Sequence, residues 1–322
     1  MELLRVVAMT GVLLLHANYF CFGYPQYASC TNATAPVYLA RFFLEYGCIA
    51  AVDVFVMLSG WFGIHARVRG ALRILAEALF VGLIVSAFLL VRGQHLGTFY
   101  EWLQAIFSTW FIWAYLALYV FSPALNRFVE HATEPELRYT LLAVFAIEWV
   151  DYALQLGAFS KGFSGLHFMA VYLLARYMRL YGAERVAKVP TSALAGLYLA
   201  LTLLMVGIQW RCRWAGNPAL YNLFLDLFTQ YHNPLCVAQA AVLLFIFARL
   251  QFQSRVVNLL GGGAFAVYLL HQCKYIRNDY CEIFRNIHLS HTLPEALLFD
   301  ALAVVAVYLT AVAIDYVFRR LW

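Results

Sequence analysis

Charged residues are scarce in this sequence. They make up 12% of its 322 residues, whereas a soluble domain carries about 25%. Hydrophobic residues make up 64%, and the mean hydropathy is +0.74. A water-soluble globular protein is therefore excluded. A long polar segment is also missing, so any activity must lie within the membrane region or at its two mouths.

Further absences narrow the possible functions. The seven cysteines include no CxxC pair, so we expect no metal site. The glycine run Gly261–Gly263 lacks the lysine and hydroxyl of a P-loop, which argues against a nucleotide-binding loop. Many transporters have an internal repeat, and none is visible here. Cys30, Cys212 and Cys281 fall in segments that we place outside, where a disulfide among them is possible but not established by spacing.

The hydrophobic runs predict an all-α, polytopic membrane bundle of about ten transmembrane helices, at about 20 residues per span. The predicted spans are 2–22, 37–64, 71–91, 105–124, 138–156, 165–181, 191–210, 231–250, 258–276 and 295–318. The N-terminal run lacks a small-residue cleavage site and is interpreted as a retained span. The distribution of Lys and Arg places both termini in the cytoplasm. We expect residues 1–322 to form one transmembrane domain with no appended soluble domain.

The first span contains Arg5 and His16. Eleven helical residues turn through about 1100°, close to three full turns, so the two side chains share one face about 16 Å apart. A histidine inside hydrocarbon is costly and predicts a functional site. The alternative is a packing histidine that is hydrogen-bonded to a neighbouring helix.

Five buried ionisable residues are predicted to share one depth, roughly 15–20 Å from the cytoplasmic helix ends. They are His16, Asp53, Glu148, Asp151 and His271. A histidine beside a carboxylate can act as a general base whose tautomer the acid fixes, so we select His16 and Asp53 as catalytic candidates. His16, Asp53 and Glu148 could instead form the proton relay of a transporter.

The stretch HARVRGALR contains Arg67, Arg69 and Arg73 at the predicted cytoplasmic end of the second span. Such a cluster could bind anionic lipid headgroups or a phosphate-rich ligand. The last outer segment, RNDYCEIFRNIHLSHTLPE, is interpreted as a lid, an acceptor-binding surface or a connection. Ser59 is interpreted as a helix-packing residue rather than a nucleophile.

Four stretches, in this order and spacing, resemble the acyltransferase-3 family of membrane acyltransferases, which modify extracytoplasmic glycans. They are ELLRVVAMTGVLLLHA, VDVFVMLSGWF, STWFIWAYLALYVFSP and GGGAFAVYLLH. The resemblance implies that His16 is catalytic, that Arg5 orients the CoA phosphates or thioester, and that the arginine cluster binds the nucleotide end of CoA. This sequence departs from the family pattern because its clustered arginines lack the R-x-x-R spacing.

With this resemblance, the sequence predicts a membrane O-acyltransferase that moves an acyl group, most simply acetyl (from acetyl-CoA), from cytoplasmic acyl-CoA to a hydroxyl of an extracytoplasmic or lipid-linked glycan. The expected partners are acyl-CoA, a sugar or polysaccharide acceptor and the lipid bilayer, with no metal and no nucleic acid; a homo-oligomer is left open. The expected location is a bacterial inner membrane. The alternative is a proton-coupled transporter or exporter. A scaffolding protein would leave the buried ionisable residues unexplained.

Overall fold

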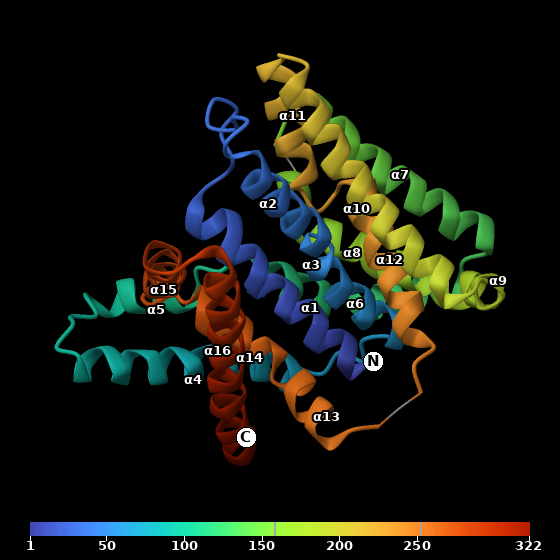
Figure 1. The fold of residues 1–322 in the computed structure, drawn as a ribbon. Coiled ribbons are helices and arrows are strands. Elements are labelled where there is room, and N and C mark those ends of the chain that lie inside the picture. Colours follow the sequence, from blue (N-terminus) through green and yellow to red (C-terminus); the bar gives the residue numbers. More distant parts are fainter. Residues whose placement is uncertain (158, 252) are drawn as a thin grey trace. The chain divides into compact units, whose positions relative to one another are not determined.

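The structure, a computed structural model, describes residues 1–157, 159–251 and 253–322. All regular secondary structure within these residues is helical, in agreement with the predicted all-α fold (Figure 1). A helix satisfies its backbone hydrogen bonds within one segment, which suits a lipid environment. The described chain divides into two compact units.

Unit 1 contains Met1, Tyr24–Ala66 and Trp113–Phe252. Its α-helices are α2 (Ala35–Cys48), α3 (Ala51–Phe62), α6 (Trp110–His131) from residue 113 onward, α7 (Glu134–Ala153), α8 (Gly165–Tyr177), α9 (Ala183–Ala187), α10 (Thr191–Trp214), α11 (Pro218–Phe228) and α12 (Pro234–Ala248). A 3₁₀ turn at Ser160–Gly162 precedes α8, and a π turn at Met178–Gly182 follows it.

Unit 2 contains Glu2–Gly23, Arg67–Ile112 and Gln253–Trp322. Its helices are α1 (Glu2–Leu15), a π turn at His16–Phe20, α4 (Val68–Val91), α5 (Phe99–Phe107), α13 (Arg255–Gly262), α14 (Ala264–Gln272), α15 (Arg277–Ser290) and α16 (Leu293–Leu321). Helix α1 packs against α13 and α14, and α16 packs against α14, α15 and α4.

Helices α3 and α8 pack closely in unit 1. A Cβ atom at Gly60 would lie only 2.5 Å from the carbonyl oxygen of Tyr172 and 2.8 Å from Cβ of Ala175. The hydroxyl of neighbouring Ser59 lies 3.0 Å from the hydroxyl of Tyr115. These contacts agree with the interpretation of Ser59 as a helix-packing residue. The SGWF stretch around it is a site of close helix packing.

The glycine run Gly261–Gly263 brings α13 and α14 against their neighbours in unit 2. A Cβ atom at Gly261 would lie 2.7 Å from the carbonyl oxygen of Glu2, and one at Gly263 would lie 2.9 Å from Cγ2 of Val312. Only glycine permits these approaches of α13 to α1 and of the α13–α14 junction to α16. Close packing thus accounts for the run without a bound nucleotide.

Each predicted span overlaps at least one helix, but several spans are interrupted. Span 37–64 divides into α2 and α3, span 258–276 divides into α13 and α14, and span 2–22 changes to a π turn at His16. The last outer segment forms α15, and α11 was also not predicted. Hydropathy continues across such interruptions, so it does not register a local change in backbone hydrogen bonding.

Among the described residues, five helical segments are long and apolar enough to cross a membrane: Glu2–Phe20, Ala35–Phe62, Val68–Val91, Thr191–Trp214 and Pro294–Leu321. The bent pair Phe99–Phe107 and Trp110–His131 makes a sixth if it counts as one span. Several apolar helices are therefore present. The number of about ten spans and the cytoplasmic placement of both termini stay predictions.

We predict that Gly60→Ala destabilises the protein by about 1–3 kcal/mol, because the added methyl group overpacks the contact between α3 and α8. The matched control is Gly207→Ala on α10, where a Cβ atom meets nothing within 4 Å. Thermal unfolding in detergent should show a midpoint several degrees lower for Gly60→Ala than for the control. Equal midpoints would contradict the described packing.

Candidate active site

Two histidines face each other in unit 2. Nδ1 of His16, which follows the last residue of α1, lies 2.8 Å from Nε2 of His271 on α14. His271 is buried, whereas His16 is partly accessible. The pair thus connects a partly exposed residue to one that is fixed in the interior of the unit.

The hydrogen bonds of this pair determine which nitrogen carries each proton. Nδ1 of His271 lies 2.6 Å from the carbonyl oxygen of Val267, which can only accept, so this nitrogen is a donor. Nε2 of the neutral His271 ring is then an acceptor, and Nδ1 of His16 donates to it. The other nitrogen of His16, Nε2, keeps its lone pair and can act as a base.

Gln272 places its side-chain amide beside the same nitrogen. Its Nε2 atom is assigned 3.0 Å from Nδ1 of His16. Nitrogen and oxygen of an amide exchange places by a flip, so a donating Nδ1 of His16 requires Gln272 to present its oxygen. In that orientation the Gln272 oxygen shares the single Nδ1 proton of His16 with Nε2 of His271. The sequence did not single out Gln272.

The helix that carries His16 changes its hydrogen bonding at that residue. Helix α1 is regular up to Leu15, and His16–Phe20 form a π turn. Tyr280 on α15 donates its hydroxyl to the carbonyl oxygen of Leu13 at 2.7 Å. π turns are uncommon and occur frequently at functional sites. Helix α15 therefore supports the end of α1 where the candidate base lies.

A disulfide between Cys21 and Cys281 attaches the same end of the N-terminal segment to α15. Arg285 adds a hydrogen bond from Nε to the carbonyl oxygen of Cys21 at 2.8 Å. The sequence suggested a disulfide among three outer-segment cysteines, of which only Cys281 takes part. Cys30 and Cys212 are buried free thiols. Cys21 lies inside the predicted span 2–22, so sequence reasoning did not consider it.

The four candidate CoA-binding arginines all belong to unit 2. Arg5 forms a partly exposed ion pair with Glu2, at 2.6 Å. Arg67 is exposed at the N-cap position of α4. Arg69 and Arg73 are exposed on α4 and four residues apart, so they share one face of the helix. The i, i+4 pair thus presents two guanidinium groups together despite the missing R-x-x-R spacing.

Two buried acids accompany these arginines. Asp315 on α16 is 1% exposed and forms an ion pair with Arg319 one turn later. Glu77 on α4 is 7% exposed and interacts electrostatically with Asp315, Arg73 and Arg319. Neither acid is among the residues predicted from the sequence, although ionisable residues inside predicted spans are a functional signal.

His167 lies between two carboxylates in unit 1. Its Nε2 is 3.2 Å from Oδ1 of Asp53, and its Nδ1 is 3.1 Å from Oε2 of Glu148. All three side chains are at most 2% exposed. Cys236 lies 3.7 Å from the second oxygen of Asp53. The described contacts of Asp53 are thus with His167 and Cys236, and Asp53 lies in the first turn of α3, where the helix dipole favours a negative charge.

The His167 cluster holds one basic ring between two acids. Both ring nitrogens of His167 face acceptors, so both contacts are satisfied when the ring is an imidazolium. One positive charge then faces two carboxylates, which leaves either one negative charge or one protonated carboxyl. Oε1 of Glu148 is buried with no hydrogen-bond partner among the described residues.

His167 is not among the site residues predicted from the sequence. The residue lies near the outer end of the predicted span 165–181, where a polar side chain at a membrane surface is ordinary. In the structure it is fully buried, and Ser164 caps α8 by accepting from its backbone N–H at 3.2 Å. Its position between acids on α3 and α7 results from tertiary packing.

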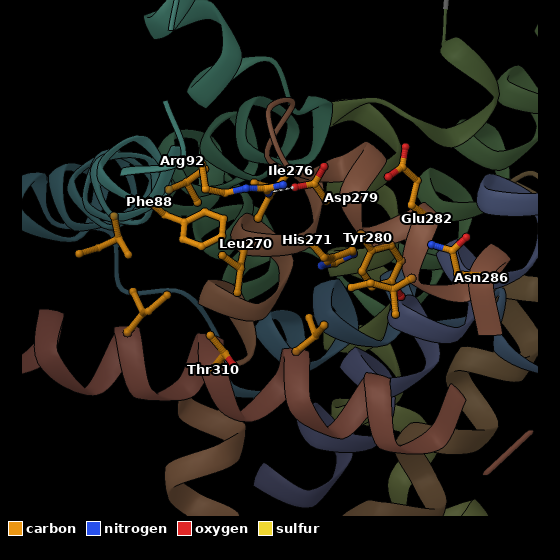
Figure 2. Close-up of a pocket in the computed structure, with 15 residues that line it drawn as sticks. Phe88, Arg92, Leu270, His271, Ile276, Asp279, Tyr280, Glu282, Asn286 and Thr310 are labelled. Carbon is orange, nitrogen blue, oxygen red and sulfur yellow. Dashed lines mark hydrogen bonds and ion pairs between the residues drawn. The ribbon is translucent and has the colours of Figure 1, made fainter. Parts of the chain in front are cut away.

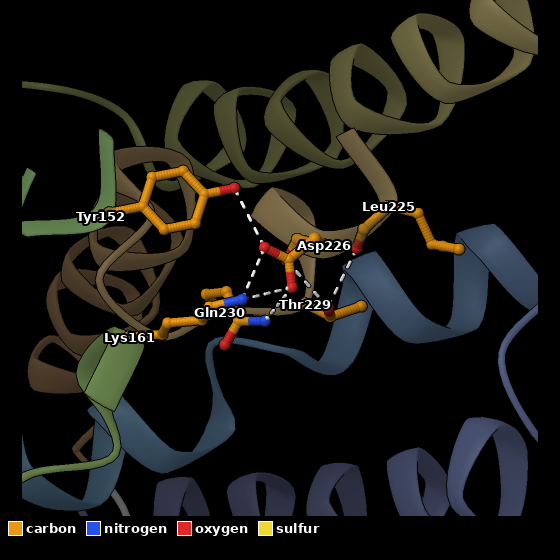
Figure 3. A network of polar contacts seen from close by, with 6 residues as sticks. All are labelled: Tyr152, Lys161, Leu225, Asp226, Thr229 and Gln230. Carbon is orange, nitrogen blue, oxygen red and sulfur yellow. Dashed lines mark hydrogen bonds and ion pairs between the residues drawn. The ribbon is translucent and has the colours of Figure 1, made fainter. Parts of the chain in front are cut away.

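Asp151 stabilises a turn in unit 1. It is buried near the end of α7, and its Oδ2 accepts from the backbone N–H of Phe159 at 3.2 Å. In the same turn, Lys161 has a φ of 56° and pairs with Asp226 at 2.8 Å. Asp226 also accepts from the hydroxyl of Tyr152 at 3.1 Å (Figure 3). These contacts hold the turn beside a cavity of about 420 Å³.

The five residues of the predicted layer divide between the units. His16 and His271 pair in unit 2, whereas Asp53, Glu148 and Asp151 belong to unit 1. A single layer therefore stays a prediction. Within the described ranges, no group of three or more His, Cys, Asp or Glu side chains is arranged to hold a metal ion.

The family model of an acyltransferase domain, acyltransferase-3, matches residues 1–316. The chain belongs to the acyltransferase-3 family. The match extends over both units, and together with the apolar helices it makes the protein a membrane acyltransferase. Comparisons with curated proteins and with solved structures found no match.

The disulfide predicts a defined count of alkylated cysteines. In denaturing detergent without reductant, an alkylating reagent should add five adducts, because Cys21 and Cys281 are joined. After reduction it should add seven, one for each cysteine. A Cys21→Ser variant, which has six cysteines, should take six in both cases. Seven adducts on unreduced wild type, counted by mass spectrometry, would disprove the pairing.

The His167 cluster predicts that neutralising its two acids restores the stability lost when His167 is replaced. His167→Leu should destabilise the protein by about 3–5 kcal/mol, because it leaves buried carboxylates without their partner. Adding Asp53→Asn and Glu148→Gln removes the charges and should restore much of the lost stability. The measurement is the free energy of unfolding in a denaturant titration. A triple variant less stable than His167→Leu would mean that the carboxylates do not depend on the histidine.

Proposed function

We propose that the protein transfers an acyl group, most simply acetyl, from cytoplasmic acyl-CoA to a hydroxyl of an extracytoplasmic or lipid-linked glycan. The observation that carries the proposal is the histidine pair, in which His271 leaves Nε2 of the partly exposed His16 as a base. Family membership supports the reaction class. The identities of the donor, the acyl group and the acceptor are proposed here in addition to that reaction class.

In the proposed reaction, Nε2 of His16 takes the proton of the acceptor hydroxyl while the hydroxyl oxygen attacks the thioester carbonyl. The carbon–oxygen bond forms, the carbon–sulfur bond breaks, and CoA leaves as a thiolate. His16 then returns the proton to the sulfur. His271 accepts from Nδ1 of His16 throughout and therefore stabilises the transient imidazolium without changing its own protonation.

The arginines of unit 2 suit the donor. CoA carries several negative charges on its phosphates, and guanidinium groups bind phosphate through paired, charge-assisted hydrogen bonds. Arg69 and Arg73 share an exposed face of α4, and Arg5 lies about 16 Å along α1 from His16. A slim pantetheine arm can span that distance, so the thioester would reach His16 while the nucleotide stays at the arginines.

A second candidate function is proton-coupled transport. The observation that favours it is the buried cluster of Asp53, His167 and Glu148, because chains of such side chains form the proton relays of transporters. A transporter of this kind would neither bind acyl-CoA specifically nor release free CoA. Acyl-CoA binding therefore separates the two functions.

The test is acetyl-CoA binding to the purified protein by calorimetry, with acylation of the surface glycan in cells as the second readout. We expect Arg69→Ala with Arg73→Ala to weaken binding at least ten-fold, because two phosphate-binding guanidinium groups are lost. His16→Ala should bind acetyl-CoA like wild type but fail to acylate. The matched control is Arg211→Ala, which removes an exposed arginine on α10.

Wild-type protein that binds no acetyl-CoA at millimolar concentration would count against an acyl-CoA donor. Proton-coupled uptake into liposomes would then be the next measurement. Acylation at the wild-type rate by His16→Ala would instead remove His16 from the chemistry and leave the donor assignment intact.

A further inference from the structure

A cavity of about 590 Å³ lies within unit 2, lined by α4, by α14 to α16 and by the segment between α14 and α15. This volume falls in the range of pockets that bind small organic ligands, about 300–1,000 Å³. Figure 2 shows Arg92 and Asp279 together on one side of the cavity and Thr310 on the other. All lining residues belong to unit 2, so the cavity is complete within it.

The cavity has an apolar part and a polar edge. Its apolar walls come from α4 and α16, including Val85, Phe88 and Val307. Both helices are apolar enough to cross a membrane, so these walls suit hydrocarbon. Phe88 is 52% exposed, so the apolar wall of the cavity is open at this residue.

The polar edge comes from the end of α4 and from α15. Arg92 and Asp279 form an ion pair at 2.8 Å, and both side chains are more than 40% exposed. Glu282 and Asn286 follow on α15. These charged and amide groups can donate to and accept from hydroxyl groups. A ligand that fits the whole cavity has an apolar chain and a hydroxylated head.

The histidine pair reaches the wall of this cavity. His271 lines it, and Nε2 of His271 accepts from His16. Tyr280, which supports the end of α1, is a further wall residue. A molecule in the cavity would therefore lie next to the residues that hold the candidate base.

The position of the cavity along α4 favours the acceptor, rather than the donor, as its ligand. The lining residues Ile84 to Arg92 lie about 16 Å or more along the helix from Arg73. The arginines proposed to bind CoA are thus at one end of α4 and the cavity is toward the other. Because His271 lines the cavity, an acyl group brought along α4 from the arginines would meet the histidine pair at the cavity wall.

We infer that this cavity binds the apolar chain of an amphiphilic acceptor, such as a lipid-linked sugar, and that its polar edge holds the hydroxylated head. The inference rests on the proposed function and names the acceptor class for the same site. The chain lies between α4 and α16, and the head lies among Arg92, Asp279, Glu282 and Asn286.

The test uses a dodecyl glucoside with a photoreactive diazirine in its chain, added to the full-length protein in lipid nanodiscs. Peptide mass spectrometry should find the label on α4 near Phe88 and on α16 near Thr310. Unlabelled dodecyl glucoside should compete, whereas glucose and dodecyl phosphocholine should not. Val307→Trp fills the cavity and should reduce labelling at least five-fold. Leu309→Trp, on an exposed α16 position outside the cavity lining, should leave it unchanged.

Three outcomes would overturn the inference. Equal competition by dodecyl phosphocholine would mean that bilayer lipid fills the cavity. Competition by palmitoyl-CoA but not by dodecyl glucoside would assign the cavity to the acyl chain of the donor. No labelling of α4 or α16 would mean that the chain binds elsewhere. Acetyl-CoA calorimetry on the same sample separates these results from failure of the proposed function, because it does not depend on the cavity.

Discussion

The hydrogen bond between Nδ1 of His16 and Nε2 of His271 is the interaction on which the candidate chemistry depends. It has a direction because the Val267 carbonyl fixes the proton of His271. The pair can form because the glycine run lets α13 and α14 approach α1 and α16. Helix α15 supports the end of α1 through the hydrogen bond from Tyr280 to Leu13. Packing, rather than a carboxylate, thus prepares the base.

In each unit, a buried acid faces a basic side chain of the same unit. In unit 1, His167 faces Asp53 and Glu148. In unit 2, Asp315 faces Arg319. An unpaired charge in such surroundings would cost several kcal/mol, so each member requires its partner. These clusters show that a buried ionisable residue in a span need not be catalytic, since pairing alone can account for its burial.

The proposals for unit 2 separate the two substrates along α4. Arginines at its first turns face an anionic donor, and a cavity near its last turns suits an amphiphilic acceptor. The histidine pair then serves both. Such a division lets an acyl group move inward without transfer of the whole charged cofactor, whose phosphates would be costly to bury.

Sequence alone determined the helical class, the family and the choice of His16, because hydropathy and motif spacing are local properties of the chain. It could not identify the partner of that histidine. His16 and His271 are 255 residues apart, and His167 and Asp53 are 114 apart, so only tertiary packing brings each pair together. Tertiary packing also decides which cysteines pair and where the apolar runs are interrupted. Residue spacing specifies a helix face, but which residue that face meets depends on the neighbouring helix.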